Sequence, residues 1–371
     1  MSVKPTDPER QSDAGAGRST LREWRAFVLF LLVTPLATAC SSTPAQPTPV
    51  DPGAPTISCP AAPTPVQSPD GLAVPVGYAV ATVSGGSSPL SGPTCTPASG
   101  TGFSPGSTTV TCTVTDAKAR TGSCTFAVTV LGPPRLSLTR FLAFGDSITA
   151  GEIPSEGVAV VPRLIDPYLN YAADLTRLLA IRYRTQQPGV VNGGVQGETT
   201  ARGLARLPAT IAAGNRYEVL LLMEGANDLP GGTSSILPAA SNVQAMIRVG
   251  KAMGLKVYLA NLPPQNPNAC TGSAAFPGCI ARNGGAAFVV PFNGFMPGLA
   301  AAEGVPLVDV HAAFKGDVTT LIDFDGLHPT AAGYQTIADA FFAVIKETLE
   351  LPATASPSSL TMPFFVAPWR P

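Results

Sequence analysis

The sequence predicts a parallel α/β sheet with helices on both faces, preceded by a small all-β module. Two observations support this fold class. After residue 138, short apolar runs that suit buried strands alternate with stretches of helical periodicity. Between residues 57 and 130, short β-type runs are separated by turns rich in Gly, Ser and Pro, as in a β-sandwich. A chain of 371 residues is long enough for both domains.

The beginning of the chain has the pattern of an export signal. Arg18, Arg22 and Arg25 precede an apolar run over residues 26–39, and that run ends in small residues. It is shorter than the roughly 20 apolar residues that a membrane-spanning helix needs, so it suits the core of a signal peptide.

Cys40 directly follows these small residues, and the segment resembles a bacterial lipobox. The resemblance implies a lipoprotein signal peptide over residues 1–39 and lipidation of Cys40, although Ala37 stands where leucine is commonest. Ser41 after the cysteine favours the outer membrane by the same resemblance. A plain secretory signal and a retained anchor helix are the alternatives.

Residues 40–57 are dominated by Pro, Thr, Ser and Ala, a composition that predicts an extended linker. The all-β module is expected over residues 58–132. Its predicted strands are 72–83, 109–115 and 124–130. In the last of these, alternation places Phe126, Val128 and Val130 on one face. Gly132-Pro133-Pro134 is the expected hinge.

Of the seven cysteines, six remain once Cys40 is set aside, an even number that predicts disulfides in an oxidising compartment. Cys59, Cys95, Cys112 and Cys124 lie in the β module, where their pairing stays open. We expect Cys270 and Cys279 to pair and to restrain the loop between them as one wall of a substrate pocket. Buried free thiols are the alternative.

The α/β domain is expected over residues 138–350, followed by a tail over 351–371. Its predicted strands are 141–144, one around Val190, 219–223, 255–260 and 307–310. Its predicted helices are 167–183, 200–212, 242–253, 292–302 and 330–349. In the last helix an apolar face is expected to pack in the core, made of Tyr334, Ile337, Phe341, Ile345 and Leu349.

Ser147 and His328 are candidates for a nucleophile and its base. Ser147 lies in Phe144-Gly145-Asp146-Ser147-Ile148, at the end of the first predicted strand of this domain. A serine hydroxyl is a weak nucleophile near neutral pH and needs an adjacent base. His328 is one of two histidines, and Asp325 precedes it by three residues in a turn that Pro329 favours. Asp323 is the alternative carboxylate.

Two further segments fall at predicted strand ends. Gly197 follows the Val190 strand at the start of a helical stretch, and Asn227 follows the strand that ends at Met223. With the Ser147 N–H, their donors are candidates for an oxyanion hole. Turn geometry for the glycines and helix capping by Asn227 and Asp228 are the structural alternatives.

These four segments, in this order, resemble the SGNH or GDSL hydrolase family, over about residues 138–350. The resemblance implies a flavodoxin-like three-layer sandwich and an ester hydrolase with Ser147, Gly197, Asn227 and His328 as its named residues and Asp325 as carboxylate partner. Residues 197–208 look most like the thioesterase I and lysophospholipase branch. The β module resembles a hyalin-repeat (HYR) unit with an immunoglobulin-like sandwich.

Other candidate sites have less support. Ser104 matches a G-x-S-x-G pattern but precedes a proline and lacks the strand and helix that this nucleophile elbow requires. His311 follows a short strand and is interpreted as structural. The sequence has no motif for a metal or a nucleotide cofactor, so we expect neither. A net charge of -1 without a basic stripe argues against a nucleic-acid partner.

The sequence therefore predicts a serine esterase of the lipase, lysophospholipase or thioesterase kind. It is expected in the bacterial cell envelope, bound to the membrane by its lipid anchor. A carbohydrate O-deacetylase with the same site residues and an adhesion lipoprotein without activity are the alternatives.

Overall fold

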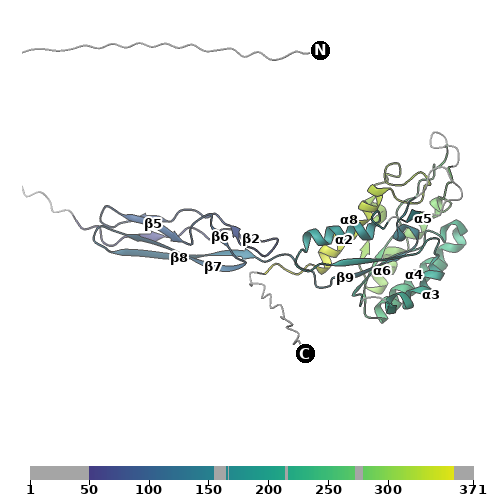
Figure 1. Ribbon diagram of the computed structural model, residues 1–371, viewed down its shortest axis with the longest axis horizontal. Helices are drawn as coiled ribbons and strands as arrows, with labels where there is room; N and C mark the ends of the chain where they lie inside the picture. The colour runs from purple at the N-terminus through teal and green to yellow at the C-terminus, as the bar shows by residue number, and fades with distance from the viewer. Residues whose placement is uncertain (1–49, 154–163, 166, 214–215, 272–278, 355–371) are drawn as a thin grey trace, which may run out of the picture. The chain divides into compact units, whose positions relative to one another are not determined.

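The computed structural model describes residues 50–153, 164–165, 167–213, 216–271 and 279–354 (Figure 1). Its N-terminal part is a β module with its own core. Alternate residues of two long strands, β7 and β8, point into this core, and they include Val110, Val128 and Val130. The strands are β1 (Thr56–Ser58), β2 (Val66–Gln67), β3 (Val74–Pro75), β4 (Thr82–Ser84), β5 (Ser91–Thr96), β6 (Gly102–Phe103), β7 (Gly106–Thr115) and β8 (Thr121–Leu131).

The module contains a four-stranded sheet in the order β2-β8-β7-β5, with two smaller strand pairs, β1-β4 and β3-β6. The predicted single strand over residues 72–83 was wrong. The chain there forms β3 and β4 with a loop between them, and they pair with different partners.

Two disulfides cross this module, Cys59–Cys124 and Cys95–Cys112. They lie next to one another because Cys112 is opposite Cys124 across β7 and β8, and opposite Cys95 across β5 and β7. Three of these sulfur atoms lie within 4.8 Å of one another, a spacing found in metal sites, but each is bonded to another sulfur. The cluster is therefore a pair of crosslinks.

The second domain is a five-stranded parallel sheet in the order β12-β9-β13-β14-β15. In chain order within the domain this is 2-1-3-4-5, the doubly wound flavodoxin-like order. The predicted α/β fold is confirmed. Its strands are β9 (Arg140–Gly145), β12 (Gly189–Gly194), β13 (Val219–Met223), β14 (Lys256–Ala260) and β15 (Leu307–Val308), with a separate short pair, β10 (Glu152–Ile153) and β11 (Leu164–Ile165).

Helices cover both faces of the sheet, with α2 and α8 packed together on one face and α3 and α4 on the other (Figure 1). The helices are α1 (Ser147–Ala150), α2 (Tyr171–Arg182), α3 (Thr200–Ala213), α4 (Thr233–Ala252), α5 (Ala286–Asn293), α6 (Met296–Glu303), α7 (Val310–Ala313) and α8 (Ala331–Leu349), with a 3-10 turn η1 (Leu229–Gly231). None of the helices in the described ranges is both long and apolar enough to cross a bilayer.

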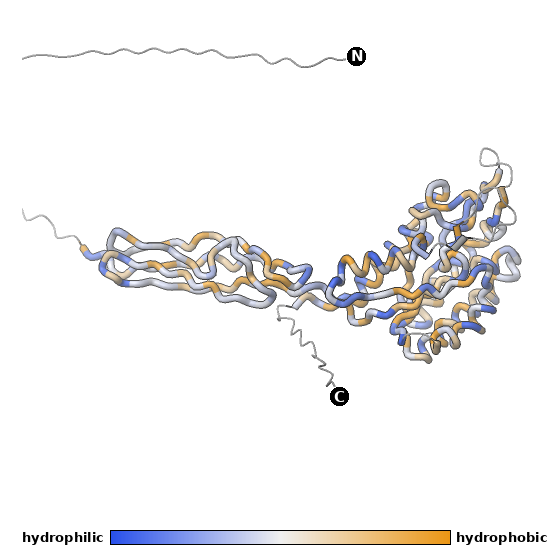
Figure 2. Tube along the Cα trace, in the orientation of Figure 1, coloured by the Kyte–Doolittle hydropathy of each residue, from blue (hydrophilic) through white to orange (hydrophobic). Residues whose placement is uncertain are grey.

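The core of this domain forms around β9 and β13, which are buried along almost their whole length. Figure 2 shows hydrophobic and hydrophilic residues mixed along the helices around the sheet, as expected of helices that bury one face. The apolar face predicted for α8 is confirmed, since all five of its predicted residues are buried.

Several element boundaries differ from the predictions. The helix expected from residue 167 begins at Tyr171, because the Asn170 side chain accepts the N–H of Ala173 as an N-cap. The helix expected over 242–253 begins at Thr233 and contains Pro238. The helix expected over 292–302 is two helices, α5 and α6. The strand expected over 307–310 ends at Val308, since Asp309 caps α7.

The strand register aligns the carboxyl ends of β9, β12 and β13. Gly145 at the end of β9 is paired with Gly194 of β12 on one side and with Met223 of β13 on the other. The segments that follow these three strands therefore leave the sheet side by side. In an open α/β sheet this is the switch point at which ligands bind.

Candidate active site

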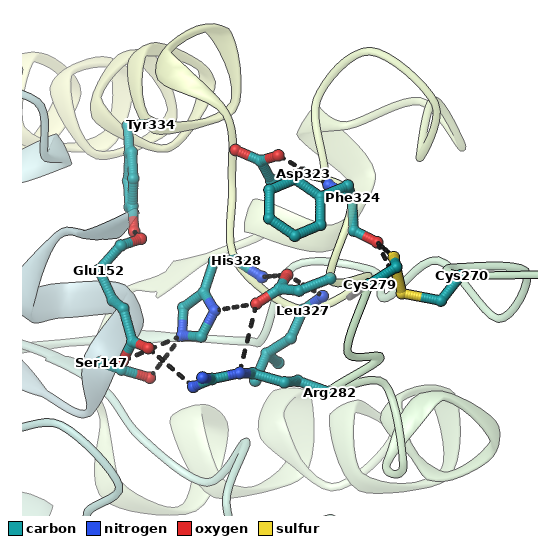
Figure 3. A network of polar contacts seen from close by, with 11 residues as sticks. Ser147, Glu152, Cys270, Cys279, Arg282, Asp323, Phe324, Leu327, His328 and Tyr334 are labelled. Atoms are coloured by element: carbon teal, nitrogen blue, oxygen red, sulfur yellow. Dashed lines mark hydrogen bonds and ion pairs between the residues drawn. A yellow bond between two sulfur atoms is a disulfide. The ribbon is translucent and has the colours of Figure 1, made fainter. Parts of the chain in front are cut away.

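Ser147, His328 and Asp325 form a continuous hydrogen-bonded chain. His328 Nε2 lies 2.9 Å from Ser147 Oγ, and His328 Nδ1 lies 2.6 Å from Asp325 Oδ2 (Figure 3). A proton on Nδ1 that is donated to the carboxylate leaves Nε2 free to accept the serine proton. All three side chains are at most 2% exposed. The structure thus brings together the three residues that the sequence proposed as nucleophile, base and acid.

The Asp325–His328 segment is a tight turn built on the aspartate itself. Asp325 Oδ1 accepts the backbone N–H groups of Leu327 and His328, each at 3.0 Å, which leaves Oδ2 for the imidazole. Burial alone would favour the neutral acid at Asp325, but the His328 hydrogen bond and charge and these N–H groups outweigh burial. The pKa of the Asp325 carboxyl is therefore below its usual range. The alternative, Asp323, accepts the N–H of Phe324 instead.

Asp146 fixes the position of Ser147 at the first position of α1. Its side chain accepts the N–H of Ile148 at 2.9 Å as an N-cap, and the N–H of Ala226 at 3.3 Å. The same carboxylate thus ties the loop that carries Ser147 to the segment that contains Asn227. Burial raises the pKa of the Asp146 carboxyl to about 6.

The predicted oxyanion donors lie on segments that are bonded to each other. The Asn227 side-chain amide donates to the carbonyl of Glu198, at 2.9 Å, and so links the loop after β13 to the residue that follows Gly197. An amide nitrogen carries two N–H groups, so a second one remains for a ligand. The Glu198 carboxylate is in turn held by Arg206, whose guanidinium lies over the Phe144 ring.

Asp228 is a helix cap, but of a different helix from the one that the sequence suggested. Its carboxylate accepts the backbone N–H and the hydroxyl of Thr200, at 2.9 and 2.8 Å, at the start of α3. It makes no side-chain cap bond to η1, which follows it in the chain. Asn227 and Asp228 therefore hold the segment 198–200 together.

Glu152 and Arg282 also lie at the site, although no sequence motif pointed to them. Glu152 Oε2 lies 3.6 Å from His328 Nε2, and Arg282 Nη1 donates to Glu152 Oε1 at 2.8 Å (Figure 3). The acidic residue five positions after Ser147, in a segment with few charges, was the available signal for Glu152. Arg282 had no such signal, because a loop between distant elements carries it to the site.

The predicted Cys270–Cys279 disulfide is confirmed. It lies beside the Asp325–His328 turn, called the acid turn below. Both sulfur atoms face the carbonyl of Phe324, the residue before Asp325 (Figure 3). On either side of the crosslink, Asn266 N–H donates to Gly326 O and Arg282 N–H to Asp325 O. Residues 272–278 lie outside the described part of the chain, so their role as a pocket wall stays a prediction.

The remaining candidates lie elsewhere. Ser104 is exposed in the β module. His311 is half-buried in α7, and its backbone N–H donates to Asn261, in keeping with the structural interpretation. Cys40 lies outside the described residues.

A flavodoxin-like sheet with a hydroxyl, imidazole and carboxylate chain at its switch point has the features of a serine hydrolase. The chain belongs to the GDSL-like lipase/acylhydrolase family, whose model matches residues 143–336. It is a carboxylic ester hydrolase with an HYR domain, whose model matches residues 50–130.

Two characterised relatives are named for the same chemistry. Esterase TesA of Pseudomonas aeruginosa is 29% identical over 164 residues, which cover 43% of this chain and 71% of that protein. An arylesterase of Vibrio mimicus is 32% identical over 130 residues, which cover 34% of this chain and 56% of that protein.

Among solved structures, the chain is similar to Est24, a carbohydrate acetylesterase from Sinorhizobium meliloti. The two are 22% identical with a TM-score of 0.42, over 56% of this chain and 96% of that one. A lipase/acylhydrolase from Enterococcus faecalis is 23% identical with a TM-score of 0.44, over 57% and 97% of the two chains.

Proposed function

We propose that the protein hydrolyses acyl esters outside the cytoplasm by a Ser-His-Asp mechanism with Ser147 as nucleophile. The observation that supports this most directly is the hydrogen-bonded chain from Ser147 Oγ through His328 to Asp325, with distances of 2.9 and 2.6 Å. These distances lie within the reach that proton transfer requires.

In this mechanism Ser147 Oγ attacks the ester carbonyl while His328 Nε2 takes the hydroxyl proton. The imidazolium then gives that proton to the leaving alcohol, and an acyl-serine remains. Water, deprotonated by the same nitrogen, attacks the acyl-serine, and the imidazolium then returns that proton to Ser147 Oγ as the carboxylic acid is released. Asp325 holds the Nδ1–H tautomer and stabilises the imidazolium.

The tetrahedral oxyanion would be bound by the N–H groups of Ser147 and Gly197 and by the second amide N–H of Asn227. Such donors act on charge that develops in the transition state, so each contributes more to turnover than to substrate binding. The bonds from Asn227 and Asp228 to the 198–200 segment support this assignment, because they keep the donors preorganised.

The decisive variant is Ser147→Ala, assayed in the full-length protein on nitrophenyl esters. We expect loss of turnover with unchanged thermal unfolding. Ser104→Ala is the matched control, because Ser104 is an exposed serine of the other domain, and it should keep full activity. Full turnover by Ser147→Ala would refute the mechanism.

A series of nitrophenyl esters of increasing chain length, together with an O-acetylated polysaccharide, identifies the substrate class. An optimum at medium or long chains supports the lipase and thioesterase assignment. Activity confined to acetyl groups supports the deacetylase alternative. Inactivity of the wild type on every ester would favour the adhesion lipoprotein.

We also propose export and lipid anchoring. The three disulfides support an oxidising compartment, since such bonds seldom persist in the cytosol. The lipobox-like sequence before Cys40 supports an anchor at that cysteine. Cys40→Ala should then abolish lipid labelling and membrane retention, and membrane recovery of that variant with an acyl group elsewhere would contradict this proposal.

A further inference from the structure

A second buried carboxylate lies against the imidazole of His328. Glu152 begins β10, five residues after Ser147, and is 1% exposed. Between them Gly151 ends α1 with a φ of 87°, a left-handed conformation that glycine adopts without strain and that reverses the chain. Glu152 Oε2 is thereby placed 3.6 Å from His328 Nε2, the nitrogen that also meets Ser147 Oγ.

The position of Glu152 is fixed from two sides. Arg282 Nη1 donates to its carboxylate at 2.8 Å, and the hydroxyl of Tyr334 on α8 donates to its backbone carbonyl at 2.9 Å (Figure 3). Arg282 also faces the other carboxylate of the site, with Nε 4.0 Å from Asp325 Oδ2. The result is a ring in which two carboxylates alternate with the guanidinium and the imidazole.

The charges of this ring favour the positively charged imidazolium over the neutral imidazole. Before reaction the ring contains two negative groups, one positive guanidinium and a neutral imidazole. After His328 Nε2 takes the Ser147 proton, each positive group lies between two negative groups. An interaction that gains strength on proton transfer lowers the barrier and adds little to substrate binding.

We propose that Glu152 is a positioning residue of the esterase reaction that stabilises the His328 imidazolium. Arg282 offsets part of the negative charge of Glu152 and Asp325 and so limits how strongly these carboxylates stabilise the imidazolium. The inference rests on the proposed roles of Ser147 and His328.

Charged and titratable groups from several elements face His328. They are Asp325 on its own segment, Asp146 and Ser147 at the start of α1, and Glu152 on β10. Arg282 on the 279–285 loop and Tyr334 on α8 are linked to the site through Glu152, and the backbone N–H of Asp323 donates to the His328 carbonyl. Of these, Glu152 is the carboxylate that faces the reacting nitrogen, and Arg282 is the cation that pairs with it. Substituting these two separates their effects from the others.

The test compares Glu152→Gln and Arg282→Gln in the full-length protein, with kcat and KM for a nitrophenyl ester measured from pH 5 to 9. For Glu152→Gln we expect kcat to fall about tenfold or more with KM within twofold, and the acid limb of kcat/KM to move about 0.5 to 1 pH unit lower. For Arg282→Gln the acid limb should move to higher pH, because both carboxylates then face the imidazole without their cation.

Glu350→Gln is the matched control. Glu350, like Glu152, is a carboxylate paired with an arginine, here Arg182, but it is only partly buried and follows the far end of α8, whose 19 residues span about 28 Å. The acid limb of kcat/KM and the kcat of Glu350→Gln should equal those of the wild type. Glu152→Asp keeps the charge and should return the acid limb toward its wild-type position.

If the acid limb moves to lower pH in Glu152→Gln and to higher pH in Arg282→Gln, the inference is supported. Loss of packing alone would not move the acid limb in a direction that depends on the charge removed. An unchanged acid limb in Glu152→Gln overturns it, whether kcat is kept or falls in step with the folded fraction. Ser147→Ala in the same assay keeps the two proposals apart. If Ser147→Ala is inactive while Glu152→Gln behaves as the wild type, the mechanism stands and only the role of Glu152 is refuted.

Discussion

In the proposed mechanism, the amide nitrogen of Asn227 both donates to the oxyanion and bonds to a neighbouring loop. One N–H of Asn227 Nδ2 is bonded to Glu198 O at 2.9 Å. This bond fixes the orientation of the amide group and hence the direction of its second N–H. The Glu198 side chain is anchored by Arg206, so the orientation of the donor depends on residues outside the proposed oxyanion hole. A preorganised donor of this kind costs no reorganisation during the reaction.

We predict that Asn227→Ala lowers kcat about 100-fold or more, a loss of roughly 3 kcal/mol of transition-state stabilisation. KM should change little, because the lost donor acts on charge that the ground state lacks. Steady-state kinetics, with circular dichroism as a check on folding, measure this. A rise in KM at constant kcat would instead assign Asn227 to ground-state binding.

At the scale of elements, the acid turn depends on the loops that enclose it. Gly326 lies inside the turn with a φ of 79°, and a Cβ there would lie 2.5 Å from Ala269 Cβ and 2.7 Å from Asn266 O. Real Cβ atoms do not approach a backbone oxygen so closely, so a side chain would displace the Asp325–His328 segment. Gly316 has nearly the same φ, 77°, but open space around its Cα.

We therefore predict different outcomes for two alanine substitutions with the same backbone strain. Gly316→Ala should cost about 1 kcal/mol of stability and leave kcat unchanged. Gly326→Ala should lower kcat by more than tenfold in the molecules that remain folded, because the imidazole moves relative to Ser147 Oγ. Equal kcat values for the two variants would show that the turn tolerates displacement.

The Cys270–Cys279 crosslink is a second feature that restrains a loop beside the acid turn. It closes a short loop, for which the chain-entropy model gives about 3 kcal/mol, reduced by any strain in the folded state. Because both sulfur atoms face Phe324 O and not the main core, replacing both cysteines by serine should change chain-length preference more than the melting temperature. Peptide mapping that finds either cysteine bonded to the β module, or both thiols free, would contradict this picture.

For the whole molecule, the fold contains a buried carboxyl group whose pKa is raised by its surroundings. Glu224 directly follows β13 and lies among Asp146, Glu198 and Asp228, and within the described residues neither of its carboxyl oxygens has a hydrogen-bond partner. Burial, followed by these neighbouring carboxylates, raises the pKa of Glu224 well above its ordinary value. The folded state therefore binds a proton that the unfolded chain releases above about pH 4.5.

The sign of the pH dependence follows. Between the unfolded and folded pKa values the native state binds more protons, so the free energy of unfolding falls as pH rises through this window. Glu224→Gln should match the wild type near pH 4 and should be more stable than the wild type at pH 8, by a margin that grows as the pH rises through this window. Urea titrations at both pH values measure the difference.

Glu350→Gln is the control of opposite sign. The Arg182 hydrogen bonds lower the pKa of Glu350, so this carboxylate stabilises the fold above its unfolded pKa and loses that effect as the pH falls through the folded value. The Glu350→Gln variant should be less stable than the wild type at pH 8. A pH-independent difference between Glu224→Gln and the wild type would show that Glu224 is ionised in the folded protein.

Much of this protein was predictable because its signals are local. The α/β class came from apolar runs of strand length between helical stretches, and the Ser147, Gly197, Asn227 and His328 segments each follow a strand or open a helix. Carboxyl ends of parallel strands share one edge of a sheet, so strand order was enough to expect these segments together. The even cysteine count and its division between two domains predicted the disulfides.

Only the tertiary structure decided how these segments are held. The boundary at Tyr171 depends on the Asn170 cap, and the helix that begins at Thr233 continues through Pro238. Asp228 caps a helix that precedes it in the chain, because the sheet brings β13 next to the start of α3. Glu152 and Arg282 are 130 positions apart and meet only because the loop with Arg282 folds over the acid turn. Local patterns determine which chemical groups the chain carries, whereas long-range contacts determine which charges those groups experience.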